Sequence, residues 1–169
     1  MYGFLGMCLI FVAIALILNG VARFTKMDPK TVPVMNLITG SVLVIGNFIL
    51  LAKASAPFEF YNSAAGFLFG FTYLIIAANY WFKLDLRMFG WYSLCVAAFA
   101  TFSAVWCFIG NGYVWMGVLW TAWAALWLEG FIELGLKYEK IANIFPYLSI
   151  AEGLFAAGLP AILMLIDKF

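Results

Sequence analysis

The sequence contains no histidine and few charged side chains. Charged residues make up 10% of its 169 residues and apolar residues 67%, whereas an average soluble domain is about 25% charged and about 45–50% apolar. Without histidine the chain offers no bis-histidine haem ligation, no histidine-ligated metal site and no Ser-His or Cys-His nucleophile pair. We therefore expect neither a soluble domain nor an enzyme, and we expect no cofactor.

The sequence also lacks a strong net charge and a long polar segment. The formal net charge is +1, so no large field of one sign would attract nucleic acid, and we expect no nucleic-acid partner. The mean hydropathy of +1.06 extends along the chain and leaves no segment polar enough for a separate soluble domain or linker. Residues 1–169 are predicted to form one domain embedded in a membrane.

Cysteine is scarce, and its spacing predicts no disulfide. Cys95 and Cys107 fall in one predicted helix, where their spacing corresponds to about 18 Å of rise, and Cys8 falls in another. We expect all three to be small, buried apolar groups.

What the sequence has in abundance is long apolar runs. A membrane-spanning helix needs about 20 mostly apolar residues, because lipid offers the backbone no hydrogen-bond partners. Six such runs are present, and we expect the first to be a permanent helix. They extend from Tyr2 to Val21, Val32 to Ala52, Ser63 to Phe82, Met88 to Ile109, Val114 to Leu136 and Asn143 to Ile166. The predicted fold class is an all-α integral membrane protein with six transmembrane helices.

Basic residues are distributed unevenly between the two sides of this predicted bundle. The first, third and fifth connections contain Arg23, Lys26, Lys30, Lys83, Arg87, Lys137 and Lys140, whereas only Lys53 and Lys168 lie on the other side. Lysine and arginine accumulate in cytoplasmic loops. We therefore predict a multi-pass protein of the cytoplasmic (inner) membrane with both termini outside.

These three connections resemble one another. Each has a basic residue, an acidic residue two positions later and a second basic residue, as in 26–30, 83–87 and 137–140. A recurring charged tip suggests three helical-hairpin repeats around a common axis. Alternatively, any cytoplasmic turn collects basic residues.

The predicted helix 114–136 carries a stripe of tryptophans. Trp120, Trp123 and Trp127 are three and four residues apart, so they share one face, which Met116 extends. The last two fall too deep in the span to be interfacial anchors. The stripe is either tight packing against a neighbouring helix or one wall of a narrow pore.

Two further predicted helices have stripes with the same spacing. Their members recur every three or four residues within one sector. They are Phe69, Tyr73, Ile76 and Tyr80 in helix 63–82, and Leu5, Leu9, Val12 and Leu16 in helix 2–21. Each stripe alone is compatible with core or lipid contact, but together they suggest an aromatic and aliphatic tube.

Three glutamates lie inside predicted spans, where charged groups are costly and often functional. Glu133 precedes Lys137 by four residues, which favours an ion pair with a structural role. Glu129 points opposite the tryptophan stripe, toward a neighbouring helix or subunit. Glu152 has no cation within four residues and is the strongest candidate for a functional carboxylate.

Six groups of residues, in order and over nearly every predicted helix, form a recognisable pattern. They are Leu18-Asn19-Gly20, residues 25–30 followed by Val34-Met35-Asn36, residues 66–74, Trp91-Tyr92-Ser93-Leu94, residues 120–127 with Phe131-Ile132-Glu133, and Ile150-Ala151-Glu152-Gly153. This pattern resembles the AmiS/UreI family of urea and short-chain amide channels. The resemblance implies six-helix protomers built from three hairpin repeats, each protomer with its own pore. It also implies a homohexameric ring with lipid in its central hole.

The family's two pore constrictions are formed by bulky side chains of the first, third and fifth helices. The resemblance maps these to Leu5, Leu9, Leu16, Phe69, Tyr73, Trp120, Trp123, Leu126 and Trp127. Glu152 matches the family's carboxylate in the sixth helix. The implied activity is passive conduction of urea, short-chain aliphatic amides or both, with a small neutral amide as the solute.

The sequence departs from the acid-activated member of this family in one loop. That member has a long, histidine-bearing outer loop between the second and third helices, whereas residues 53–62 here contain no histidine. We therefore predict a constitutively open channel with little pH dependence between pH 5 and 8. Glu129 leaves the choice between urea and larger amides open. A proton-coupled small-amide transporter that uses Glu129 or Glu152, and a membrane scaffold, remain alternatives.

Overall fold

The computed structural model describes residues 2–169, and this part of the chain is helical with no strands. Six helices in it are long and apolar enough to cross a membrane, which confirms the predicted fold class. The helical segments are α1 (Tyr2–Thr25), α2 (Val32–Leu51), α3 (Pro57–Phe82), α4 (Leu86–Val105), η1 (Trp106–Asn111), α5 (Val114–Gly130), η2 (Phe131–Gly135), η3 (Glu139–Ile141), α6 (Phe145–Glu152), η4 (Gly153–Gly158) and α7 (Leu159–Leu165).

The third helix begins earlier than the predicted Ser63, and local capping explains why. Pro57 occupies the first turn of α3, where its missing N–H costs no hydrogen bond. The Glu59 carboxylate accepts hydrogen bonds from the backbone N–H groups of Ser55 (2.7 Å) and Ala56 (3.0 Å). The connection between α2 and α3 is therefore only residues 52–56.

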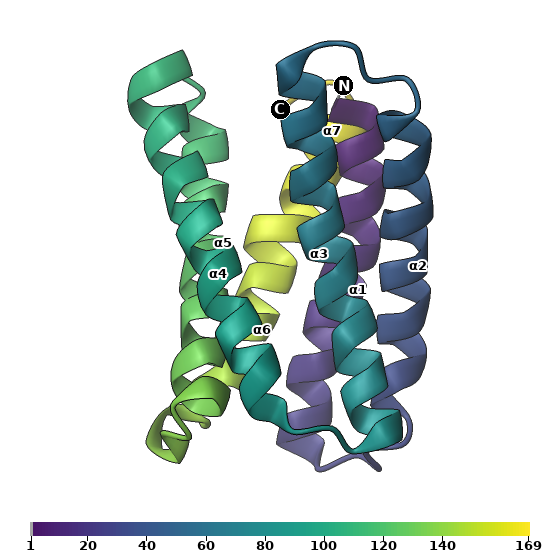
Figure 1. Cartoon of the computed structure of the whole chain (residues 1–169), viewed down its shortest axis with the longest axis vertical. Coiled ribbons are helices and arrows are strands. Elements are labelled where there is room, and N and C mark those ends of the chain that lie inside the picture. Colours follow the sequence, from purple (N-terminus) through teal and green to yellow (C-terminus); the bar gives the residue numbers. More distant parts are fainter. Residues whose placement is uncertain (1) are drawn as a thin grey trace.

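The helices pack most extensively in three pairs. These pairs are α2 with α3, α4 with α5, and α1 with the α6–η4–α7 rod. Figure 1 shows α2 and α3 together on one side, α4 and α5 on the other, and α6 between them, with both termini at the end of the α2–α3 connection. The hairpins with basic tips, such as α3 and α4, make far fewer contacts. Packing is more extensive between the predicted hairpins than within them, and the three-repeat arrangement stays a prediction.

The three basic connections nevertheless share a backbone turn. Lys26, Lys83 and Lys137 follow the ends of their helices in a left-handed conformation, with φ values of 50°, 51° and 55°. Two residues later, Asp28 and Asp85 each accept a hydrogen bond from the backbone N–H two positions on, at 2.9 and 3.0 Å. We call the end of the bundle that carries these loops the basic end.

Buried polar contacts hold α1 against its neighbours. Asn19 and Asn36 exchange two amide hydrogen bonds, at 3.0 and 2.8 Å, between α1 and α2. The Ser149 hydroxyl donates to the Leu16 carbonyl (2.7 Å) and ties α6 to α1. Such contacts fix helix register in a membrane, where apolar side chains suit both lipid and protein.

The expectation for the cysteines is correct at two positions and wrong at the third. Cys8 and Cys107 are buried, whereas Cys95 is exposed on α4. An apolar thiol tolerates lipid as well as protein contact, so sequence does not distinguish the two environments.

Candidate pore

Two cavities occupy the interior between the six spanning helices. The larger, of about 360 Å³, reaches the basic end, where Arg23, Lys83 and Leu86 line it. The smaller, of about 150 Å³, reaches the opposite end, where Leu50, Phe58 and Tyr113 line it.

Two side chains line both cavities, Phe69 of α3 and Trp123 of α5. Their rings meet edge to face with centroids 4.9 Å apart. The centroid of the Trp127 ring lies 4.8 Å from that of the same Phe69 ring, and the ring centroids of Trp120 and Trp123 are 5.1 Å apart. These rings form an aromatic partition between the cavities, which we call the Phe69–Trp123 partition.

All ten residues singled out from the sequence line one or both cavities. Leu5, Leu9 and Trp120 line the smaller cavity, and Leu16, Tyr73, Leu126, Trp127 and Glu152 line the larger, with Phe69 and Trp123 between them. The exposed fractions of Trp120, Trp123 and Trp127 are 6%, 3% and 8%. The tryptophan stripe therefore faces the protein interior rather than lipid, and its role in transport remains a prediction.

Glu152 and Trp123 carry buried polar atoms that lack hydrogen-bond partners. Both carboxylate oxygens of Glu152, which is 4% exposed, and the indole nitrogen of Trp123 have none within residues 2–169. Burying an unpaired polar group costs free energy, and most such groups in folded proteins are paired. Both groups line the larger cavity, where a polar solute can supply the missing partner.

Glu133 does not pair with Lys137, contrary to the expectation from their spacing. Both Glu133 oxygens instead accept hydrogen bonds from the Arg23 guanidinium, at 2.8 and 3.0 Å. The guanidinium carbon also lies 4.3 Å from the centre of the Phe145 ring. The prediction failed because Phe131–Gly135 is a π-helix and the backbone of Lys137 has a left-handed conformation. Residues four apart, such as Glu133 and Lys137, therefore do not lie on one face as they would in an α-helix.

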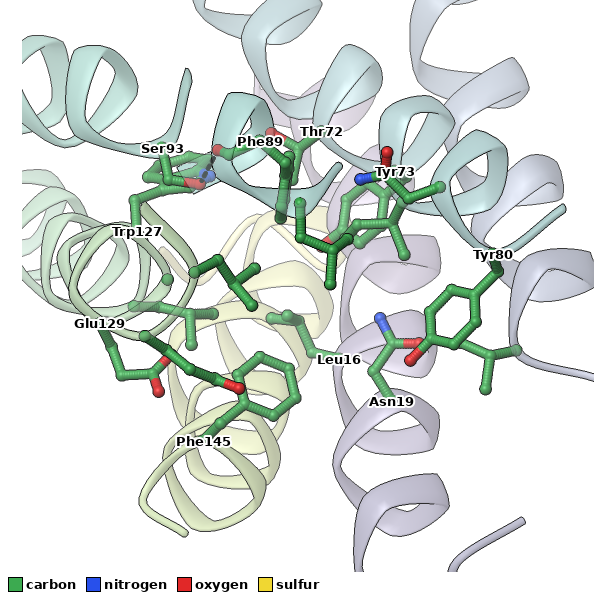
Figure 2. Close-up of a pocket in the computed structure, with 18 of the residues that line it drawn as sticks. Leu16, Asn19, Thr72, Tyr73, Tyr80, Phe89, Ser93, Trp127, Glu129 and Phe145 are labelled. Atoms are coloured by element: carbon green, nitrogen blue, oxygen red, sulfur yellow. Dashed lines mark hydrogen bonds between the residues drawn. The ribbon is translucent and has the colours of Figure 1, made fainter. Parts of the chain in front are cut away.

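Of the two neighbours expected for Glu129, a helix or a subunit, the structure favours a helix of the same protomer. Its side chain is only 6% exposed and lines the larger cavity. Figure 2 shows Glu129 beside Phe145 on one side of this cavity, with Tyr73 and Tyr80 on the other. A helical wheel correctly separates Glu129 from the tryptophan face, but it does not show that the cavity extends around α5 near the basic end.

Comparison with known proteins decides the family. The model of the AmiS/UreI family transporters matches residues 4–168. The chain belongs to the AmiS/UreI family. The resemblance seen in the sequence is thereby confirmed, and the chain is a membrane transport protein rather than an enzyme.

Relatives within the AmiS/UreI family cover almost the full length of the chain. An acid-activated urea channel of Helicobacter pylori is 37% identical, with 98% of this chain and 99% of the relative covered. The crystal structure of the urea channel from that human gastric pathogen superimposes with a TM-score of 0.88 over 98% of this chain and 99% of the other, at 38% identity. Its cryo-electron microscopy structure in a closed state gives a TM-score of 0.89, with the same coverages and 36% identity.

The family also includes proteins named for other substrates. A Mycolicibacterium smegmatis protein whose name provisionally assigns it to transport of amidate substrates is 31% identical over 94% of this chain and 75% of the relative. The alignment with the Helicobacter pylori channel spans 194 positions, more than the 169 residues here, so that channel contains residues that this chain lacks.

Among the lining residues that were not identified from the sequence, two carry polar or charged groups of interest. Asn79 of α3 lines the larger cavity, and its side-chain nitrogen has no hydrogen-bond partner within residues 2–169. The sequence identifies Arg23 only as one of the basic residues of the first connection, yet Arg23 forms an ion pair with Glu133 at the basic end. Asn79 could have been found as a polar residue within a span. The contact of Arg23 with Glu133, 110 positions away, left no local signal.

Proposed function

We propose that this protein is a passive channel for urea and short-chain aliphatic amides across the cytoplasmic membrane. One observation carries the proposal: the two cavities reach opposite ends of the spanning bundle and meet at the Phe69–Trp123 partition. The names of the relatives, which include a urea channel, support the choice of solute.

The partition is suited to neutral, planar solutes. A flat amide can exchange hydration for contact with the rings of Phe69, Trp123 and Trp127. Its carbonyl can accept a hydrogen bond from the Trp123 indole N–H, and Glu152 can accept from its amino groups. An ion would lose its hydration without compensating ligands, at a cost of many kcal/mol.

The remaining predicted residues complete this path. Leu5, Leu9 and Trp120 are assigned to the apolar entry on the smaller-cavity side. Leu16, Tyr73 and Leu126 are assigned to the wall of the larger cavity, on the far side of the partition. We assign the basic end to the cytoplasm because lysine and arginine concentrate there, which leaves both termini outside.

Two further properties belong to this proposal. Because the chain has no histidine, the channel conducts at similar rates between pH 5 and 8. A homohexamer with lipid in its centre is the assembly that the family resemblance implies, and native mass spectrometry with retained lipid would test it.

Reconstitution into liposomes tests the function directly. The wild-type protein should accelerate urea or acetamide entry without salt current, and Trp123→Ala should change the flux or its selectivity. Equal amide flux with and without the protein, or a measurable salt current, would refute a neutral-amide channel. Unchanged transport by Trp123→Ala would favour a scaffold role for the aromatic residues.

A second candidate is proton-coupled transport of small amides. It is favoured by Glu129 and Glu152, whose buried carboxylates lack hydrogen-bond donors within residues 2–169. Coupled transport predicts accumulation of amide above its external concentration in the presence of a proton gradient, with collapse on addition of an uncoupler. A channel only equilibrates the solute.

A further inference from the structure

We propose that Glu129 is a specificity-determining residue that accepts the N–H groups of a primary amide on the basic-end side of the Phe69–Trp123 partition. This inference rests on the proposed amide-channel function and adds to Glu152 a second acceptor for the amino end of the solute.

The fold gains little from the Glu129 carboxylate. The Glu129 side chain is 6% exposed, and neither oxygen has a hydrogen-bond donor within residues 2–169. Burying a carboxyl group without a donor lowers stability, so a neutral side chain of similar size would serve the fold at least as well. Structural stability therefore does not explain a carboxylate at this position.

Several side chains near Glu129 are already engaged. The Glu133 carboxylate lies near Glu129 and repels it when both are ionised. Both oxygens of Glu133 are held by Arg23, whose guanidinium also faces the Phe145 ring. The Ser93 hydroxyl, which lines the same cavity, donates to the Phe89 carbonyl. Glu129 lines the larger cavity, so a solute there can supply N–H groups once a side-chain rotation turns the buried carboxylate oxygens toward it.

Two polar groups that lack partners within residues 2–169 follow each other along α5. The indole nitrogen of Trp123 is a donor without a partner, and Glu129 is an acceptor six residues further along. Six residues of α-helix correspond to about 9 Å along the axis. A solute that leaves the partition therefore meets a donor for its carbonyl first and an acceptor for its amino group next.

This arrangement favours solutes with an N–H edge. Urea, formamide and acetamide present N–H groups beside the carbonyl, whereas N,N-dimethylacetamide has a similar carbonyl without any N–H. Glu129 should therefore improve the binding of primary amides and leave the binding of tertiary amides unchanged.

The test measures amide flux into proteoliposomes as a function of concentration for wild type, Glu129→Leu and Glu129→Gln. Loss of one hydrogen bond to a carboxyl group should raise the half-saturating acetamide concentration about tenfold in Glu129→Leu. Glu129→Gln keeps one acceptor oxygen and should show about a threefold rise. N,N-dimethylacetamide should inhibit urea flux equally in all three proteins. Glu139→Gln, which makes the same chemical change in an exposed loop, is the matched control and should behave as wild type.

A stability measurement separates binding from a structural role. Glu129→Leu should unfold at the same or a higher temperature than wild type, because an unpaired buried carboxyl group is removed. Unchanged half-saturation in Glu129→Leu would overturn the inference, and so would a lower unfolding temperature with equal loss of all fluxes. Absence of amide flux in the wild type would instead refute the channel function and the inference with it.

Discussion

The two cavities of this AmiS/UreI protein differ in chemistry as well as in size. Every described residue that lines the smaller cavity is uncharged, whereas Arg23, Lys83, Glu129, Glu133 and Glu152 all line the larger. Since an ion loses most of its hydration in an apolar cavity, the smaller one is suited to exclude ions. The larger cavity supplies the polar groups that a dehydrated neutral solute can contact.

The state of the polar groups differs too. In the smaller cavity, the Asn47 amide donates to the Leu43 carbonyl at 2.7 Å, and the Tyr61 hydroxyl donates to Ser103 at 2.6 Å. Four residues have buried polar atoms without partners within residues 2–169, and all four line the larger cavity: Asn79, Trp123, Glu129 and Glu152. In the smaller cavity, Asn47 and Tyr61 form hydrogen bonds within the fold, whereas the polar atoms without partners in the described chain belong to the larger cavity and, through Trp123, to the partition.

Glycine substitutions provide the largest test of this comparison. A Cβ at Gly90, near the larger cavity, would clash with the Gly135 backbone. A Cβ at Gly66, beside the smaller cavity, would clash with the buried Asn47 amide, a side chain that can shift only by losing its hydrogen bond to Leu43. We expect Gly90→Ala to lower the free energy of unfolding by about 3 kcal/mol or more and Gly66→Ala by about 1–2 kcal/mol. Denaturant titration in detergent measures both, and equal effects would contradict a rigid α4–η2 contact.

The Arg23–Glu133 ion pair provides the next largest effect. Arg23→Met leaves the Glu133 and Glu129 carboxyl groups together without their cation, and we expect a loss of about 2–3 kcal/mol, because the Arg23 side chain is partly exposed. The double variant Arg23→Met/Glu133→Leu should recover most of this loss. Arg87→Met, in an exposed pair with Asp85, is the control and should leave the stability almost unchanged, because solvent screens the pair. No recovery in the double variant would argue against a stabilising ion pair.

A smaller effect is expected at the opposite end of the bundle. Tyr61→Phe removes the hydrogen bond to Ser103 while keeping the ring that stacks on Phe99. We expect a loss of about 1 kcal/mol in unfolding free energy with unchanged amide flux, because this hydroxyl belongs to the fold. Tyr147→Phe, on the exposed surface, is the matched control. A loss of flux at normal stability would show that the smaller cavity also contacts solute through polar groups.

The smallest effect concerns pH at the basic end. Hydrogen bonds from the Arg87 side chain and backbone lower the pKa of Asp85, at the start of α4, to about 2. Since the pKa of an unfolded aspartate is about 3.9, its contribution to stability is fully present above that pH and is lost as pH falls through about 2. The unfolding temperature of the wild type should therefore fall more steeply below pH 4 than that of Asp85→Asn. Between pH 5 and 8 the difference between the two should stay constant, and a change in that window would contradict this assignment.

Much of the fold could be predicted from the sequence because apolar run length is a local property. The six spans and the basic connections were located by composition alone. The observed start of α3 precedes the predicted Ser63 because Pro57 and Glu59 form a local cap, which apolar run length does not reveal. The lining residues Phe69 and Trp123 were found as members of helical stripes, and Leu126 was found only through the family resemblance.

The sequence by itself determined that the chain lies in a membrane, how often it crosses, and which connections carry the basic charge, because each of these depends on residues close together in the chain. Only the tertiary structure decided that α1 packs on the last rod, that Arg23 holds Glu133, and that Glu129 faces a cavity. Lipid and protein interior are equally apolar, so hydrophobicity does not determine which helices pack together. Close-packed glycines, amide pairs and π-helical turns determine it, and the residues that they contact are distant in sequence.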